Sequence, residues 1–175
     1  MEARFEQFLS GYEEASHLRI PHWLNTSSGT QIKVHGFCDA SEKAYAAAVY
    51  LRVPEGKGSW VCNLVAAKSK VSPVKTLTIP RLELCCAVLL VDMFNWLIPA
   101  IGVQYGSLNF WIDSTIVLAW LKRPPCTWST FVANRVARIL RKAEAATWRH
   151  VASEDNPADL ASRGVTAETL HDGFL

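Results

Sequence analysis

Hydrophobic and polar positions alternate along three segments in the first half of the chain. In the first segment, every second position from Ile32 to Cys38 is apolar or glycine, which is the period of a half-buried strand. A short polar turn at 40–43 and the Pro-Glu-Gly-Lys-Gly sequence at 54–58 separate the segments. Connections this short predict consecutive antiparallel strands. The predicted strands cover residues 31–39, 44–53 and 60–68.

The second half is dominated by helical periods with two short strand patterns between them. Pro80 suits the first turn of the long helix, Pro99 is expected to end it, and Gly164 suits the position just beyond the last helix. A helical crossover between the third and fourth strands predicts that the fourth lies parallel to the first. The expected helices are 80–97, 114–122, 129–143 and 156–163, and the expected strands are 108–113 and 147–151.

These elements predict an α/β fold, in which a five-stranded mixed sheet is flanked by helices. Three antiparallel strands come first and two parallel strands follow. Residues 1–30 are expected to form a helical extension or linker, with an amphipathic helix over 1–19. Residues 31–165 then make the single domain, and 166–175 a C-terminal tail.

Composition places this chain among globular proteins, because half of its 175 residues are hydrophobic. The net charge of +2 gives no strong overall field, so binding of nucleic acid would need a local basic patch. An odd count of five cysteines and the lack of a signal-peptide pattern indicate reduced thiols and an intracellular location, in the cytoplasm or the nucleus. No membrane partner is expected, because polar residues and Pro99 interrupt the most apolar stretch, Leu82 to Ile101.

Four acidic residues stand where predicted elements begin or end. Asp39 and Asp113 each follow an apolar strand, and ligands of open α/β sheets bind at the carboxyl ends of parallel strands. Glu83 shares the apolar stripe of the long helix, and Asp159 lies in the first turn of the last helix. Carboxylates gathered in one place repel one another unless a cation neutralises them, and Mg²⁺ or Mn²⁺ prefers such oxygen ligands.

Each acid also has a purely structural interpretation. Asp39 could form a turn, Glu83 could favour the helix dipole, and Asp113 could cap the next helix, although Ser114 could do so itself. For Asp159 the capping interpretation is strong, because Asn156 suits the N-cap of its helix. Capping and metal binding are compatible roles for this residue.

Five blocks in this order give the chain a family resemblance. They are HGFCDAS at 35–41, AAKSKVSPVKTLTIPRLEL at 66–84, WIDSTIVLAWL at 111–121, FVANRV at 131–136 and WRHVASEDNPADLASRG at 148–164. From about Ile20 onward the chain resembles the ribonuclease H segment of BEL/Pao-type LTR retrotransposon polyproteins. The resemblance implies the ribonuclease H-like fold.

The resemblance also implies an activity: endonucleolytic hydrolysis of the RNA strand of an RNA–DNA hybrid with two Mg²⁺ or Mn²⁺ ions. Asp39, Glu83, Asp113 and Asp159 match the four metal-binding carboxylates of the family, in that order. His150 matches, more loosely, a loop histidine that assists proton transfer or product release. His35 is expected to be structural. The implied partners are the hybrid and the reverse transcriptase domain of the same polyprotein, and the sequence carries no signal for an oligomeric state.

Basic and aromatic residues offer further contacts to nucleic acid, although a solvated face or core packing explains most of them equally well. The tryptophans considered for base stacking are Trp60, Trp120 and Trp128. The basic candidates for phosphate contacts are Lys68, Lys70, Lys75, Lys122, Arg123, Arg135, Arg138, Arg141 and Lys142.

Three other functions are weighed against a hybrid nuclease. Retroelement segments of this type are also catalogued as aspartic peptidases, but that chemistry needs paired Asp-Thr-Gly or Asp-Ser-Gly loops, and only D-S-T at 113–115 and D-A-S at 39–41 occur. An integrase core would use three acids at a different spacing. A catalytically silent retroelement remnant could bind nucleic acid or protein without cutting, although all four carboxylates are present.

Overall fold

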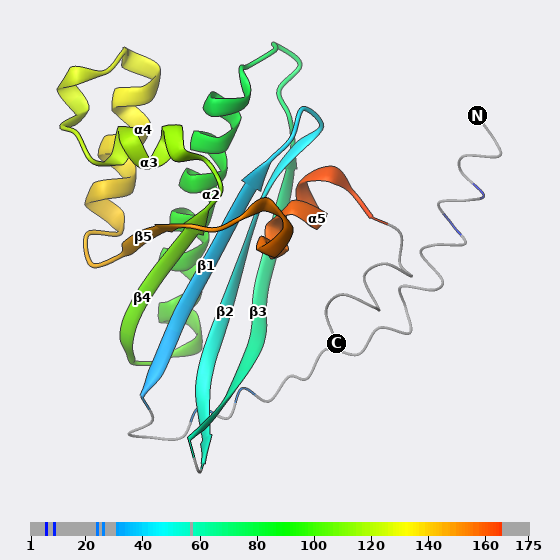
Figure 1. Ribbon diagram of the computed structural model, residues 1–175, viewed down its shortest axis with the longest axis vertical. Coiled ribbons are helices and arrows are strands. Elements are labelled where there is room, and N and C mark those ends of the chain that lie inside the picture. Colours follow the sequence, from blue (N-terminus) through cyan, green and yellow to red (C-terminus); the bar gives the residue numbers. More distant parts are fainter. Residues whose placement is uncertain are drawn as a thin grey trace. The chain divides into compact units, whose positions relative to one another are not determined.

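One mixed sheet of five strands organises the fold, in the order β3-β2-β1-β4-β5 (Figure 1). The computed structural model describes Glu6, Leu9, Leu24, Thr26 and residues 31–56 and 58–165. Within it, residues Leu24–Arg163 form one compact unit. The strands are β1 (Ile32–Ala40), β2 (Ala44–Gly56), β3 (Ser59–Val71), β4 (Tyr105–Ile112) and β5 (Thr147–His150).

The strand directions confirm the predicted mixed sheet. β2 pairs antiparallel with both β1 and β3, whereas β4 pairs parallel with β1 and β5. The long helix α2 provides the crossover that a parallel β1–β4 pair requires. The carboxyl ends of β1, β4 and β5 therefore meet at one edge of the sheet.

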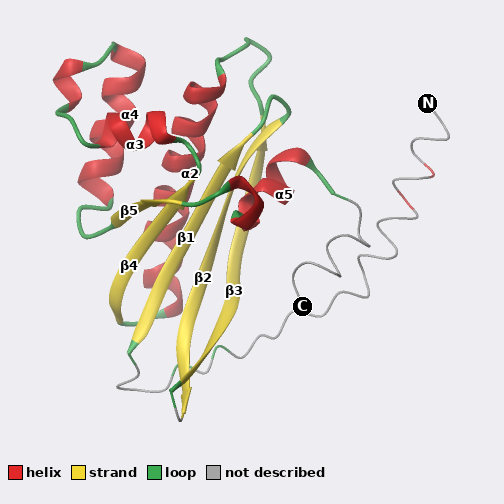
Figure 2. Ribbon diagram, viewed as in Figure 1, coloured by secondary structure: helices red, strands yellow, loops and turns green. Residues whose placement is uncertain are grey.

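Helices cover the two faces of the sheet unequally. Figure 2 shows α2, α3 and α4 behind the sheet and α5 in front of it. α2 packs on β1 and β2 and also contacts α4, while α5 packs on β1 and β2 from the other face. The helices are α2 (Ile79–Ile101), α3 (Thr115–Leu121), α4 (Thr130–Lys142) and α5 (Pro157–Arg163), with single 3₁₀ turns η1 (Pro125–Thr127) and η2 (Ser153–Asp155).

The main core lies between α2 and the sheet. On β1, Val34, Gly36 and Cys38 are buried while the positions between them are half-buried, so the period-two pattern places its apolar positions toward α2. Gly36 has no room for a side chain, because a Cβ there would lie 2.7 Å from both Leu90 of α2 and Phe110 of β4. The middle of α2 therefore approaches β1 closely at Gly36.

Two predicted boundaries were wrong. The expected loop at 54–58 is largely strand, since Pro54 of β2 pairs with Trp60 of β3. Pairing of β2 with β1 stops at Arg52, so the missing N–H of Pro54 breaks no bond on that side. Pro99 does not end α2 either: the helix continues to Ile101, and Gly102 ends it with a φ of 64° and an N–H bond to the carbonyl of Ile98.

By length and composition alone, α2 could cross a membrane, because its mean hydropathy over 18 residues is 2.0. The polar residues and Pro99 that interrupt this stretch therefore do not make the helix too polar to span a membrane. Most of its apolar side chains are buried in the core, as is usual for the central helix of a globular domain. The expected helix at 1–19 and the tail at 166–175 fall outside the described residues, except for Glu6 and Leu9.

Candidate active site

The pairing of β1 with β4 brings Asp39 and Asp113 to the same level of the sheet. Cys38 is paired with Ile112 in the parallel ladder, and each aspartate is the next residue along its strand direction. β5 extends the same edge, because His150 is paired with Ile112 on the other side of β4. Two residues that are distant in sequence thus meet at the edge where the sequence predicts a site.

Asp39 is the most buried acid of this edge, with 4% of its surface exposed. One of its carboxylate oxygens, Oδ2, accepts a hydrogen bond from the hydroxyl of Ser162 in α5. Burial raises the pKa of the Asp39 carboxyl above its ordinary value, the Ser162 hydrogen bond lowers it, and the carboxylates of Asp113 and Asp159 raise it further. The charge on Asp39 is therefore costly without a cation.

Glu83 points from the first turns of α2 toward the same edge. Its Oε2 accepts a hydrogen bond of 2.5 Å from the hydroxyl of Ser114, which also caps α3 by accepting from the backbone N–H of Val117. Burial raises the pKa of Glu83, the Ser114 bond lowers it, and Asp113 and Asp39 raise it. Glu83 therefore lies within the electrostatic reach of both aspartates.

Asp113 has one satisfied and one unsatisfied oxygen. Oδ2 accepts a 2.6 Å hydrogen bond from the hydroxyl of Ser153 in η2. Oδ1 is buried and has no hydrogen-bond partner. A buried carboxylate oxygen without a donor is energetically unfavourable, and a bound cation is one way to satisfy it.

Asp159 joins the site from α5 and keeps a structural role as well. Its Oδ1 forms a 2.7 Å ion pair with Nε of Arg163, one helical turn later. Asn156 caps this helix by accepting from the N–H of Ala158, and its Nδ2 donates to the carbonyl of Cys38 at 3.1 Å. The cap therefore also fastens α5 to the end of β1, beside Asp39.

The two histidines lie on the same sheet but differ in their contacts. His150, at the end of β5, is exposed, and its role stays a prediction. His35, in the middle of β1, accepts a 3.2 Å hydrogen bond at Nδ1 from the indole of Trp111 and stacks on that ring, in keeping with a structural role.

The four acids suit a divalent cation by their chemistry, but their present arrangement is not that of a finished metal site. Within residues 31–56 and 58–165, no three His, Cys, Asp or Glu side chains are grouped closely enough to hold an ion. Serine hydroxyls bind three of the carboxylates instead. An all-oxygen donor set, two acids with raised pKa values and the free Oδ1 of Asp113 nonetheless fit Mg²⁺ or Mn²⁺. Binding would require the carboxylates to exchange hydroxyl partners for the cation.

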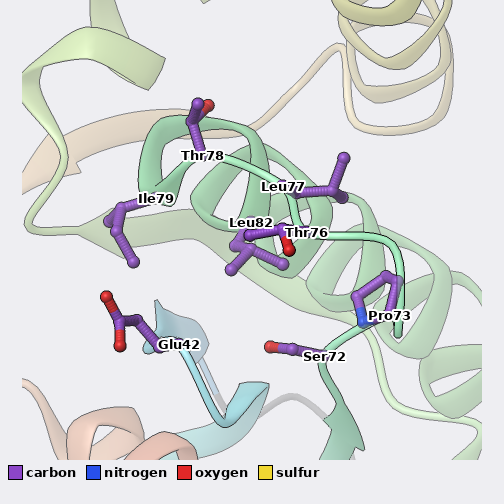
Figure 3. Close-up of a pocket in the computed structure, with 8 residues that line it drawn as sticks. All are labelled: Glu42, Ser72, Pro73, Thr76, Leu77, Thr78, Ile79 and Leu82. Carbon is purple, nitrogen blue, oxygen red and sulfur yellow. The ribbon is translucent and has the colours of Figure 1, made fainter.

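A hollow of about 440 Å³ adjoins the first turn of α2. Figure 3 shows Glu42 and Ser72 on one side of it and the residues at the start of α2 on the other. The hydroxyls of Ser72 and Thr76 point toward the hollow, whereas the side chain of Thr78 points away from it (Figure 3). Leu82 of the wall directly precedes Glu83 in α2.

Several basic candidates already have partners. Arg138 and Lys142 of α4 form ion pairs with Asp92 of α2, at 2.7 and 2.9 Å. Arg135 lies over the ring of Phe131 at 3.5 Å. Arg123 lies 5.9 Å from the ring centroid of Trp128. By contrast, the remaining candidates are exposed and have no ion pair or ring contact among the described residues: Lys68, Lys70, Lys75, Lys122 and Arg141. These five are the freer cations for phosphate contacts.

Sequence reasoning missed the serines that bind the carboxylates. Ser162 and Ser153 gave no signal as partners of Asp39 and Asp113, since the pairs are 123 and 40 positions apart. Ser114 was considered only as a helix cap, and it both caps α3 and binds Glu83. For Ser162 a weak signal exists, because it lies three residues after Asp159 and so shares one face of α5 with it.

Comparison with known proteins follows this geometry. Residues 1–114 match the model of a family described as the Pao retrotransposon-like RNaseH-like domain; this match includes Asp39, Glu83 and Asp113 but not His150 or Asp159. No curated protein matches the chain.

Similar solved structures include three ribonuclease H or reverse transcriptase proteins. RNase H1 from the halophilic archaeon Halobacterium salinarum NRC-1 is 16% identical, with 82% of this chain and 99% of that chain covered and a TM-score of 0.46. LC11-RNase H1 in complex with RNA/DNA hybrid is 12% identical, with 80% of this chain and 99% of that chain covered and a TM-score of 0.48. The foamy viral protease-reverse transcriptase dRH in complex with ds DNA is 16% identical, with 87% of this chain and 26% of that chain covered and a TM-score of 0.44. With its mixed sheet in the order β3-β2-β1-β4-β5 and the family match over well more than half of its length, the chain has a ribonuclease H-like fold and belongs to the family of Pao retrotransposon-like RNaseH-like domains.

Proposed function

We propose that this domain hydrolyses the RNA strand of RNA–DNA hybrids with the help of Mg²⁺ or Mn²⁺. The observation that carries the proposal is the pairing of β1 with β4, which brings Asp39 and Asp113 to the same level of one sheet edge. Burial raises the pKa values of Asp39 and Glu83, and the nearby carboxylate of Asp113 raises both further. Such crowding is unfavourable for folding alone and is useful where cations bind.

In this proposal the four carboxylates of Asp39, Glu83, Asp113 and Asp159 hold the ions. When bound, two divalent ions supply activation of the attacking water and neutralisation of the leaving oxygen. Asp39 is the most buried of these ligands, and the carboxylates of Asp113 and Asp159 both raise its pKa. Ser162, Ser114 and Ser153 orient three of the acids before loading. The products would carry 5′-phosphate and 3′-hydroxyl ends.

The remaining roles concern the substrate and its surroundings. The hydroxyl of Thr76, which points toward the hollow at the start of α2, can bond to a 2′-hydroxyl, the group that distinguishes RNA from DNA. His150, exposed at the end of β5, would move a proton at the departing product. The family is retrotransposon-like, so the reverse transcriptase domain of the same polyprotein is the proposed partner, and the proposed location is intracellular.

A second candidate is a silent module that keeps the fold and binds without cutting. The observation in its favour is that, within the described part of the chain, the acids bind serines and no three of them are grouped for a metal. It predicts binding of the hybrid that is independent of divalent ions.

A cleavage assay separates the two candidates. The purified chain is incubated with end-labelled RNA–DNA hybrid, single-stranded RNA or duplex DNA, with Mg²⁺, Mn²⁺ or EDTA. Cutting of the RNA in the hybrid alone, only with a divalent ion, supports the nuclease, and Asp113→Asn should abolish it while leaving hybrid binding in place. Metal-independent binding without any cutting supports the silent module.

A further inference from the structure

The face of the sheet opposite α2 carries a group of aromatic and basic side chains that the candidate active site does not use. We define this aromatic face by Lys33, Phe37, Arg52, Trp60, Trp111 and Arg149. The direction of these side chains follows from the strand period, since Gly36 and Cys38 face α2 and the residues between them point the other way. Register places Arg52 opposite Lys33, and Arg149 beside Trp111.

Aromatic rings form a connected surface at the centre of this face. Phe37 of β1 stacks on Trp111 of β4, with centroids 6.1 Å apart and an interplanar angle of 12°. Tyr50 of β2 meets Phe37 edge-on at 5.7 Å. All three rings are only partly buried, so they keep accessible surface. α5 crosses this side of the sheet at the level where Ser69 bonds to the carbonyl of Ala161, and Figure 1 shows the strands below it without a described helix over them.

Cations border the rings. The Lys33 ammonium lies 4.4 Å from the ring centroid of Trp60, the Arg52 guanidinium 5.1 Å from the same ring, and the Arg149 guanidinium 5.7 Å from that of Trp111. The outward positions of β1 from Lys33 to Phe37 and their partners on the neighbouring strands carry no carboxylate. The local charge is therefore strongly positive, although the whole chain has a net charge of only +2.

His35 supplies one more donor in the middle of these cations. Because Trp111 donates to its Nδ1, the proton of the neutral ring is on Nε2, and Nε2 is buried without a partner. Burial lowers the pKa of His35, and the charges of Arg52, Lys33 and Arg149 lower it further. An anionic ligand on the surface of this face would be attracted by these three cations.

A ligand that fits this face carries repeated negative charge and flat rings. Nucleic acid has both, but in a duplex the faces of the bases are stacked on one another and cannot meet the protein rings. We propose that the aromatic face binds single-stranded nucleic acid, with phosphates at Lys33, Arg52 and Arg149 and bases against Trp60 and the Phe37–Trp111 pair. Phe37 and Trp111 precede Asp39 and Asp113 by two residues, so a bound strand would lie beside the acidic edge.

Binding of a fluorescein-labelled oligothymidylate to the full chain tests this site. Fluorescence anisotropy is followed in EDTA over a salt series, so no cleavage contributes. The double variant Arg52→Gln/Arg149→Gln should weaken binding and reduce the slope of log K against log salt by about 0.7 for each phosphate that the variant no longer neutralises. Trp60→Leu should weaken binding about tenfold, because a base can no longer stack on the indole ring. Arg81→Gln, a change of the same kind at an exposed residue of α2, is the matched control and should leave the slope as it is.

Photocrosslinking then locates the strand. Ultraviolet crosslinks of the oligothymidylate should map to peptides of β1, β3 and β4, which carry Phe37, Trp60 and Trp111. The site is refuted if Arg81→Gln has the same effect as the double variant or if crosslinks map only to other elements. It is also refuted if the double variant alters only self-association on size exclusion, which would assign the face to a second copy. Asp113→Asn should bind the oligonucleotide like the wild type, so failure of the nuclease proposal and failure of this one give different results.

Discussion

The hydroxyl of Ser162 in α5 donates a hydrogen bond to the carboxylate of Asp39 in β1, across 123 positions of sequence. The same hydroxyl oxygen lies 3.0 Å from the carbonyl oxygen of Asp159, and the carbonyl of Ser162 accepts a hydrogen bond from the hydroxyl of Ser41. One buried residue thus joins the central acid of the candidate site to the helix that supplies the fourth acid. The position of α5 and the geometry of the site therefore depend on each other.

Replacing Ser162 with alanine should destabilise the domain. The variant leaves Asp39 buried without its donor, which costs about 1–3 kcal/mol in the free energy of unfolding. Urea denaturation measures this loss. Ser153→Ala is the control, because Ser153 also binds a site carboxylate but is exposed, so water can replace its hydroxyl at little cost. Equal destabilisation by the two variants would contradict the structural role of Ser162.

Stability without metal should improve when Asp39 becomes asparagine. Burial raises the pKa of Asp39 in the folded state above its ordinary 3.8. The folded state therefore binds the Asp39 proton more tightly than the unfolded chain does. The free energy of unfolding is highest, as far as Asp39 is concerned, when the carboxyl is protonated at low pH, and it falls as pH rises through the raised pKa of the folded state. In EDTA at neutral pH, Asp39→Asn should melt above the wild type, and the difference should vanish below the ordinary pKa of the group.

The control for this experiment is Asp159→Asn, which removes an ion pair with Arg163 instead of a buried, crowded charge. It should not raise the melting temperature. If Asp39→Asn proves less stable than the wild type in EDTA at neutral pH, the buried charge of Asp39 does not destabilise the metal-free folded state as inferred.

Asp92 should have the opposite pH dependence. Partial burial pushes its pKa upward, but hydrogen bonds and charges of Lys142 and Arg138 outweigh burial and leave the pKa below its ordinary 3.8. Asp92 therefore stabilises the folded state at pH values above its ordinary pKa, and this stabilisation is lost as pH falls through the lower pKa that it has in the folded state. Asp92→Asn should cost about 1 kcal/mol or less at neutral pH, because the pairs are partly exposed, and almost nothing in strong acid. Urea titrations at both pH values, with exposed Glu144→Gln as a control, measure the difference.

The threonine hydroxyl at the hollow should affect the choice between RNA and DNA. Thr76→Val keeps the shape of the side chain and removes its donor and acceptor at the hollow. If Thr76 contacts a 2′-hydroxyl, the variant should cut a hybrid several-fold more slowly and bind it more weakly, yet bind duplex DNA as before. Thr127→Val, a change of the same kind at an exposed residue in η1, is the control. An unchanged ratio of hybrid to duplex affinity would argue against this contact.

The sheet and its acidic edge were predictable because they depend on local patterns. Strand periods, short connections and one helical crossover were sufficient to place Asp39 and Asp113 at the carboxyl ends of neighbouring parallel strands, as observed. The prediction that Asp159 belongs to the site depended on the family resemblance. The local sequence is equally well explained by a helix cap at Asn156, and the structure contains this cap.

Features that depend on tertiary packing were not predictable. Pro99 lies inside α2 because Leu97 and Ile98 are buried in the core around it, and this packing outweighs the helix-ending tendency of proline. Pro54 fits a strand only because β1 does not extend alongside it. The serine partners of the carboxylates arise from the docking of α3, η2 and α5, which no local pattern reports.

Calorimetric titration of the substrate-free protein with Mn²⁺ tests most directly whether these four acids share a cation site. The account predicts saturable binding by the wild type and its loss in both Asp39→Asn and Asp113→Asn. Asp92→Asn should bind like the wild type, because that acid is paired with Arg138 and Lys142 of α4. Absence of binding by the wild type, or equal binding by all four proteins, would contradict the shared site.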